Sequence, residues 1–152
     1  MRKSNLVSTQ WLAENLMDPN VVVLDATMDS VLDNNDENAN RGFIPGSLFL
    51  DLKNQFSDPD ATLSHTAPSY AHFCKQVRTL GIESDTTVVI YDVKGIFSSP
   101  RAWWLFKLMG HESVFILDGG LPRWMAEHRQ LDVTPAQPQH HSSWEGCYKP
   151  DL

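Results

Sequence analysis

Short apolar runs alternate with polar turns along this chain, and the length of each run separates strands from helices. Four runs have the length and the β-branched or aromatic content of buried strands, at residues 21–24, 48–50, 88–91 and 114–117. Each run is followed directly by an aspartate, and these are Asp25, Asp51, Asp92 and Asp118. Strands in alternation with helices predict an α/β domain with a largely parallel central sheet and helices on both faces.

Apolar residues at helical spacing predict the helices around that sheet. The first helix follows Ser8 or Thr9, either of which can cap it. The second stops at Gly81, a residue that ends helices readily because it adopts a left-handed backbone. The helices are expected near residues 9–16, 69–80, 101–109 and from 121 onward. Segments without periodicity are expected to be loops, at residues 27–42 and 52–68.

Residues 86–110, TTVVIYDVKGIFSSPRAWWLFKLMG, join a buried strand, a short loop and a helix. Pro100 stands where a first-turn proline belongs, directly after a Ser-Ser pair that can cap the helix. The helix is apolar on nearly all its sides, so we expect it to be deeply packed. Its free N–H groups come to the end of the sheet, a geometry that favours bound anions. The residue that faces them, directly after the strand, is Asp92, which is already an anion.

The length and charge of the chain limit what it binds. Its 152 residues suit one domain with a sizeable core, and its formal net charge of -7 argues against nucleic acids and anionic membranes as partners. No apolar run approaches the ~20 residues that span a bilayer. The N-terminus has no apolar signal core, so the cytoplasm is the expected compartment. Prolines, glutamines and histidines in residues 132–152 predict a linker or the start of a second domain, which leaves residues 5–131 as the folded domain.

The two cysteines, Cys74 and Cys147, are too few for a disulfide framework. Cys74 lies beside Phe73 on the apolar face of the second helix, which favours a small core residue over a nucleophile. Cys147 lies in the tail, where only Lys149 is near enough in the sequence to activate it. We therefore expect neither cysteine to act as a nucleophile.

The four aspartates at the strand ends allow two interpretations. Carboxylates that gather at the carboxyl edge of a parallel sheet can hold a hard cation for phosphoryl transfer. Aspartate also caps helices and starts turns, so strand ends gather it without any metal. We favour the second interpretation, because turn chemistry alone predicts the pattern. The absence of a glycine-rich phosphate motif of the GxxxxGK[ST] type argues further against phosphoryl transfer. We accordingly expect no metal ion and no cofactor.

Six motifs between Val7 and about Trp124 have a familiar combination and order. They read VSTQWLAENL, VVLDAT, FIPGSLFLD, LGI followed by VVIYD, FSSPRAWWLFKLMGH and LDGGLPRW. The PRAWW helix and the LDGG turn are specific together, whereas each alone is a weak signal. On these motifs the chain resembles the rhodanese family of sulfurtransferases, and within it the N-terminal half of the tandem two-domain thiosulfate and 3-mercaptopyruvate sulfurtransferases. The resemblance implies a rhodanese-like α/β domain over most of the chain.

Members of that family move a sulfane sulfur through a cysteine persulfide. The resemblance places the cysteine directly after the strand, which is the position of Asp92, in a loop whose N–H groups stabilise a thiolate. A carboxylate has no sulfur to accept, so the resemblance implies the non-catalytic type of domain. A cysteine-bearing rhodanese domain would then be its partner, and a small sulfur donor would bind in the cleft that the two domains share. We expect the isolated chain to have no sulfurtransferase activity.

The resemblance also implies a histidine in that cleft. His65, in the TLSHTAP stretch, matches a histidine that reaches the active-site cleft of the partner domain in the mercaptopyruvate branch. Lys53 stands where the family usually has an acidic residue, and a lysine cannot orient an imidazole as a carboxylate would. Phe43 is a second departure, since the family commonly has histidine before the Ile-Pro-Gly turn.

Three further residues are candidates for shaping the cleft. Arg101, at the start of the buried helix, is expected either to hold the loop or a substrate anion or, as we favour, to pair with a strand-end aspartate. Lys94 lies in the loop and is placed to neutralise Asp92. Phe97 is expected to be either an exposed apolar tip that packs on a partner domain or a residue of the core.

The sequence therefore supports three hypotheses about function. The first is the structural and cleft-forming half of a sulfurtransferase. The second is a stand-alone, non-catalytic rhodanese-like module that binds or regulates. The third is a magnesium-dependent phosphoryl-transfer or receiver-like domain built on the strand-end aspartates.

Overall fold

The computed structural model describes residues 5–27, 42–52 and 67–149. Its strands form one sheet in the order β1-β5-β4-β2-β3, and every neighbouring pair is parallel. The strands are β1 Leu6–Val7, β2 Val21–Asp25, β3 Leu48–Phe49, β4 Thr87–Tyr91 and β5 Val114–Leu117. The predicted parallel sheet is confirmed. The short edge strand β1 was not predicted, because two residues are too few to show a period.

The helices of the described ranges are α1 Thr9–Asn15, α3 Tyr70–Thr79, α4 Ser99–Leu108 and α5 Gly120–Ala126. Ser8 caps α1 by accepting the N–H of Trp11 at 3.0 Å, and Ser69 caps α3 in the same way through His72 at 3.1 Å. All of these helices lie where the hydrophobic pattern predicted them. None of them has the length and apolar character that crossing a bilayer requires.

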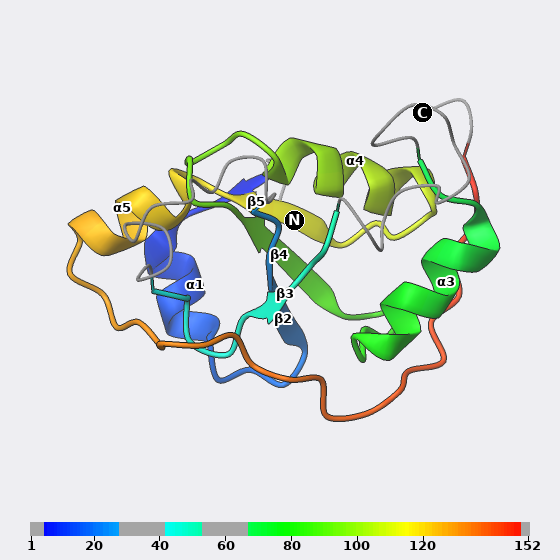
Figure 1. Ribbon diagram of the computed structural model, residues 1–152, viewed down its shortest axis with the longest axis horizontal. Coiled ribbons are helices and arrows are strands. Elements are labelled where there is room, and N and C mark those ends of the chain that lie inside the picture. Colours follow the sequence, from blue (N-terminus) through cyan, green and yellow to red (C-terminus); the bar gives the residue numbers. More distant parts are fainter. Residues whose placement is uncertain (1–4, 28–41, 53–66, 150–152) are drawn as a thin grey trace.

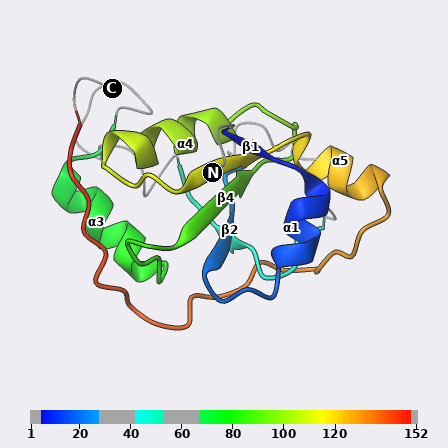
Figure 2. The ribbon, with the colours of Figure 1, turned by 180° about the vertical axis from the view of Figure 1, so that it is seen from behind.

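The helices cover both faces of the sheet, as the alternation of the central strand dictates (Figures 1 and 2). On β4, Val88 and Ile90 point into a core shared with α3 and α4. Val89 and Tyr91, one residue on in each case, point into a second core shared with α1 and α5. Because β4 is buried on both faces, it is the rigid element on which the loops at the edge of the sheet rest.

Helix α4 packs on all sides, as its apolar composition predicts, and none of its residues is fully exposed. Its end is set by Gly110, which has φ 93° and donates its N–H to the carbonyl of Lys107, while the N–H of His111 bonds to the carbonyl of Phe106. This pair of bonds is the usual Schellman ending. The predicted cap at its start is wrong, because the N-cap Ser98 makes no side-chain capping bond.

Residues 132–149, hereafter the strap, run from the end of the α5 region along the β3 edge to α3 (orange to red in Figure 1). The backbone of Asp132 exchanges two hydrogen bonds with Phe43, at 2.8 and 2.9 Å, and the N–H of Ala136 bonds to the carbonyl of Ser47 at 2.7 Å. At the other end, Trp144 is fully buried in the α3–α4 core. The boundary expected after residue 131 stays a prediction, and the strap beyond it lies against the domain.

Candidate functional site

The order of the strands creates a topological switch point between β2 and β4. From β2, the next strand in sequence, β3, lies on one side and β4 lies on the other. The loops that leave the carboxyl ends of β2 and β4 are therefore neighbours, and this is where parallel sheets bind ligands. The loop after β4, residues 92–99, is hereafter the Asp92 loop. It forms the centre of the candidate site.

The side chain of Asp92 is buried inside its own loop, with 1% of its surface exposed. One carboxylate oxygen, Oδ1, accepts the N–H of Lys94 at 2.9 Å. The other, Oδ2, accepts the N–H groups of Phe97 at 3.0 Å, Ser98 at 3.0 Å and Ser99 at 2.8 Å. Two of these donors belong to the first turn of α4, where free N–H groups carry partial positive charge. The predicted anion position exists, and the carboxylate of Asp92 occupies it.

The Asp92 loop is fastened to the segments on both of its sides. The carbonyl of Asp92 accepts the N–H of Leu121 at 3.1 Å, which joins the loop to the start of α5. The hydroxyl of Ser98 donates to the carbonyl of Ala26 at 2.7 Å, which joins the loop to the end of β2. Ser98, predicted as a helix cap, is thus a tether between the two loops of the switch point, and Asp92 takes over the capping.

Gly120 allows the close approach of α5 to this loop. It has φ 56°, and a Cβ atom at this position would lie 2.5 Å from the carbonyl oxygen of Gly95 and 2.8 Å from that of Asp92. Only glycine combines this backbone conformation with so short a distance. The sequence predicts a turn at the Gly-Gly pair but not this contact, although the pair itself is the signal for it.

Asp25, at the end of β2, is held by a second set of bonds. Its Oδ1 accepts the N–H of Thr27 at 3.0 Å, and its Oδ2 accepts the hydroxyl of Tyr91 at 3.2 Å. Because the Tyr91 hydroxyl donates to Asp25, it accepts from its other partners, Ser47 at 3.0 Å and the N–H of Ile44 at 3.2 Å. This buried network braces the β2 side of the switch point.

The strand-end aspartates serve separate local purposes. Asp25 and Asp92 each accept the N–H of the residue two positions on, which is the turn chemistry that the favoured interpretation predicts. Asp118 is half-exposed and pairs with Arg123 at 3.4 Å. Within the described ranges, no three carboxylate, histidine or cysteine side chains lie together as metal ligands would. The third hypothesis, which needs converging carboxylates, gains nothing from this arrangement.

Arg101 does not make the ion pair that we expected. Its guanidinium lies over the ring of Trp104, one helical turn further along α4, with 5.6 Å between Cζ and the ring centroid. No strand-end aspartate lies within ion-pair distance among the described residues, and Nη2 is buried without a hydrogen-bond partner. Partial burial lowers the pKa of Arg101 below its usual value. Stacking on an aromatic face competed successfully with pairing, because Trp104 is one turn away.

Lys94 and Phe97 both lie in the Asp92 loop, and their side chains point outward. The side chain of Lys94 is exposed, and the residue reaches Asp92 through its backbone N–H rather than through its ammonium group. Phe97 is 62% exposed and its neighbour Ile96 is 49% exposed. The interpretation of Phe97 as an exposed apolar tip is therefore correct for this chain. The tip is presented at the same edge of the sheet as Asp92.

Two candidate residues lie outside the described ranges, and these are Lys53 and His65. Their roles stay as the resemblance implies them. Of the cysteines, Cys74 is 5% exposed within the α3–α4 core, as predicted, and Cys147 is exposed on the strap. The sequence does not predict the pairing of His111 and Trp144 in the core, because an isolated histidine and a tryptophan in a polar tail carry no pattern.

Comparison with known proteins gives the same family throughout. A family model described as "Rhodanese-like domain" matches residues 8–127. The chain is 43% identical over 123 residues to thiosulfate/3-mercaptopyruvate sulfurtransferase 1, mitochondrial, of Arabidopsis thaliana, covering 80% of this chain and 32% of that protein. It is 38% identical over 143 residues to human 3-mercaptopyruvate sulfurtransferase, covering 88% of this chain and 47% of that protein.

Solved structures show the same architecture. The 3-mercaptopyruvate sulfotransferase SseA from Escherichia coli superimposes with a TM-score of 0.85 and 32% identity, over 97% of this chain and 57% of that one. The Tum1 protein from Saccharomyces cerevisiae superimposes with a TM-score of 0.76 and 26% identity, over 96% and 50%. The chain thus spans less than half the length of the two curated relatives above.

Proposed function

We infer, because the chain belongs to the rhodanese-like domain family, that it is the N-terminal, cleft-forming half of a sulfurtransferase. Its sulfur donor would be thiosulfate or 3-mercaptopyruvate, the substrates printed in the names of its curated relatives. The persulfide cysteine would come from a second rhodanese-like domain, on the same polypeptide or on a separate chain. The cytoplasm stays the expected compartment.

The observation that carries this proposal is the filled Asp92 loop. Four backbone N–H groups that could stabilise a cysteine thiolate are bonded to the carboxylate of Asp92 instead. A thiolate is the nucleophile in sulfur transfer, and a carboxylate cannot form a persulfide. The loop therefore supports a role in structure and docking, with the sulfur carried elsewhere.

The outward side chains of the same loop supply the surface that such a role needs. Ile96 and Phe97 present an apolar tip beside the cationic Lys94, at the edge of the sheet where a cleft with a second domain would form. Arg101, at the start of α4 just behind the loop, lies over the ring of Trp104. Lys53 and His65 would complete the cleft if the resemblance holds for them.

The isolated chain is expected to take up no sulfur. After incubation of the 152-residue chain with thiosulfate, its intact mass should be unchanged, and thiosulfate with cyanide should yield no thiocyanate above the uncatalysed background. A Cys147→Ser variant is the matched control, because Cys147 is the exposed thiol. Sulfur retained by that variant, or turnover by either chain, would contradict the proposal.

Removing the apolar tip is expected to weaken docking of the two domains. In a complete protein that includes a cysteine-bearing domain, Phe97→Ala should lower sulfurtransferase activity several-fold and increase protease sensitivity between the domains, since the side chain is 62% exposed here. Val133→Ala, which trims a residue that is 88% exposed on the strap, is the control. Equal activity and equal cleavage rates for wild type and Phe97→Ala would exclude a docking role.

A stand-alone module that binds or regulates is the second candidate. The occupied Asp92 loop favours this candidate as well, because the carboxylate of Asp92 stabilises the loop without any catalytic role. The two candidates differ in whether a cysteine-bearing domain associates with this chain. Co-purification of the chain with such a domain distinguishes them.

A further inference from the structure

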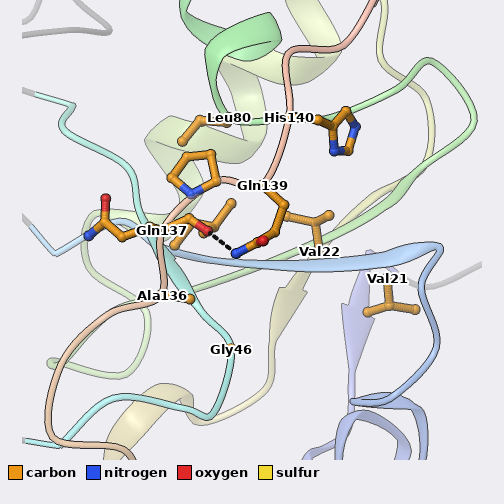
Figure 3. Close-up of a pocket in the computed structure, with 11 residues that line it drawn as sticks. Val21, Val22, Gly46, Leu80, Ala136, Gln137, Gln139 and His140 are labelled. Carbon is orange, nitrogen blue, oxygen red and sulfur yellow. Dashed lines mark hydrogen bonds between the residues drawn. The ribbon is translucent and has the colours of Figure 1, made fainter.

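The middle of the strap crosses a pocket rather than a packed surface. Residues 136–140 and the side chains of Val22, Leu48 and Leu80 line a cavity of about 220 Å³, shown in Figure 3. The amide of Gln139 bonds to the carbonyl of Gln137 within the strap, at 3.2 Å, and not to the domain beneath it. The contact between Nε2 of His140 and the carboxylate of Glu83, 3.3 Å apart, joins two well-exposed groups and contributes little. The strap is therefore held mainly at its two ends.

The C-terminal end of the strap, residues 142–149, is the better anchored one, and we name it the latch. Six of its backbone N–H groups bond to the domain: Ser142 to the carbonyl of Arg78, Ser143 to the carboxylate of Glu83, Glu145 to the hydroxyl of Ser84, Gly146 to the hydroxyl of Tyr70, Cys147 to the carbonyl of Met109 and Lys149 to the carbonyl of Leu108. The side chain of Trp144 enters the core between α3 and α4, where its ring lies 5.5 Å from that of Phe73. Trp144 is thus the side chain through which the latch enters the core.

That side chain is bonded to a buried histidine. The indole N–H of Trp144 donates to Nδ1 of His111 at 3.0 Å, and Nε2 of His111 lies 2.8 Å from the carbonyl of Thr86. A carbonyl only accepts, so Nε2 carries the hydrogen and Nδ1 keeps its lone pair for the indole. Both nitrogens are therefore used by the neutral imidazole. A second proton would have to go to Nδ1, where it would face the N–H of Trp144.

The surroundings of His111 oppose its protonation on balance. Burial lowers its pKa, and the backbone contacts with Thr86 and Ser113 each raise it by a smaller amount. Of the nearby charges, Lys107 on α4 lowers the pKa and Glu112 raises it, while Glu112 is itself paired with Lys107 and Lys149. From α3, Arg78 adds a cation that bonds to the carbonyl of Trp144.

We propose that the His111–Trp144 hydrogen bond makes the latch acid-sensitive, so that mild acid frees the end of the strap and opens the pocket beneath it while the sheet stays folded. The direction of the pH effect follows from the protonation of His111 in the open and closed states of the latch. In the open state His111 is solvated and takes a proton near its ordinary pKa of about 6.5. In the closed state it does not. The latch is fully effective above pH 6.5 and weakens as the pH falls from 6.5 toward the lowered pKa.

Native-state hydrogen exchange on the complete 152-residue chain, followed by NMR, tests this directly. After correction for intrinsic exchange rates, the opening constants at the N–H groups of Gly146 and Cys147 should rise about tenfold between pH 7.5 and 5.5. At both pH values these groups should exchange faster than the N–H of Ile90 in β4, which reports unfolding of the whole sheet. The imidazole signals of His111 should titrate below the ordinary value.

Two variants separate the latch from other acid effects. His111→Gln keeps one acceptor for Trp144 and one donor for Thr86 but has no proton to gain, so its opening constants should not respond to pH. His141→Gln, which removes an exposed histidine of the strap, should keep the wild-type response. A response that persists in His111→Gln would overturn the proposal. So would latch amides that exchange no faster than Ile90, or a normal titration of His111, which is read on the unmodified chain.

Discussion

Asp92→Ala is expected to lower the free energy of unfolding by about 3–5 kcal/mol. The change leaves the N–H groups of Lys94, Phe97, Ser98 and Ser99 without their acceptor at a site that is 1% exposed. One unsatisfied buried donor costs about 1–3 kcal/mol. The total stays below four times that figure, because water can enter and the loop can relax. Urea unfolding, followed by circular dichroism, measures the difference.

Asp118→Ala is the matched control for that measurement. Asp118 also follows a strand directly, but it is half-exposed and its one ion pair, with Arg123, is a surface contact. Its loss should change stability by less than about 1 kcal/mol. Asp92→Asn is a sharper probe, because its amide nitrogen would turn donors toward donors and so should destabilise nearly as much as alanine. Equal effects for Asp92→Ala and Asp118→Ala would mean that the buried carboxylate does not hold the loop.

Gly120→Ala is expected to destabilise the domain by about 3–5 kcal/mol and to displace the Asp92 loop. A methyl group there would lie 2.5 Å from the carbonyl oxygen of Gly95 and 2.7 Å from its Cα, both of which are backbone atoms that cannot turn aside. The left-handed φ of 56° adds strain for any L side chain. Unfolding experiments give the loss, and chemical shifts of the loop amides report its displacement.

Gly46→Ala separates strain from collision in that result. Gly46 also has a left-handed backbone, with φ 78°, but a Cβ atom there would meet nothing within 4 Å. It should therefore show the conformational penalty alone, about 1–2 kcal/mol. If Gly120→Ala were no worse than Gly46→Ala, the loop and α5 would have room that the structure does not show.

The hydrophobic pattern predicted the elements well because their signals are local. Val88 to Tyr91 are buried on both faces of the sheet, which a continuous apolar run predicts directly. Ser8 and Ser69 cap the helices that follow them, since the capping bond spans only three residues. β1 escaped prediction because Leu6 and Val7 become a strand only by pairing with β5. Its existence depends on a partner more than a hundred positions away.

The candidate site was predicted only in part, because some of its contacts follow from local signals and others depend on distant residues. The anion position before α4 follows from helix geometry, and Asp92 was identified as the residue that faces it. Competition among partners was not predictable. Ser98 prefers the carbonyl of Ala26 to the helix start, and Arg101 prefers the ring of Trp104 to an aspartate. Each choice depends on which groups tertiary packing brings within reach.

The strap also bears on how this chain behaves among copies of itself. A sheet edge offers unpaired N–H and carbonyl groups to any passing strand, and such edges are where β-rich proteins begin to aggregate. Here the outer strand β3 has two residues, and the carbonyl of Ser47 beside it is already taken by Ala136. Pro135 and Pro138, which flank that contact, have no N–H to offer. The segment that looked like a tail in the sequence thus shields this margin of the sheet against self-association.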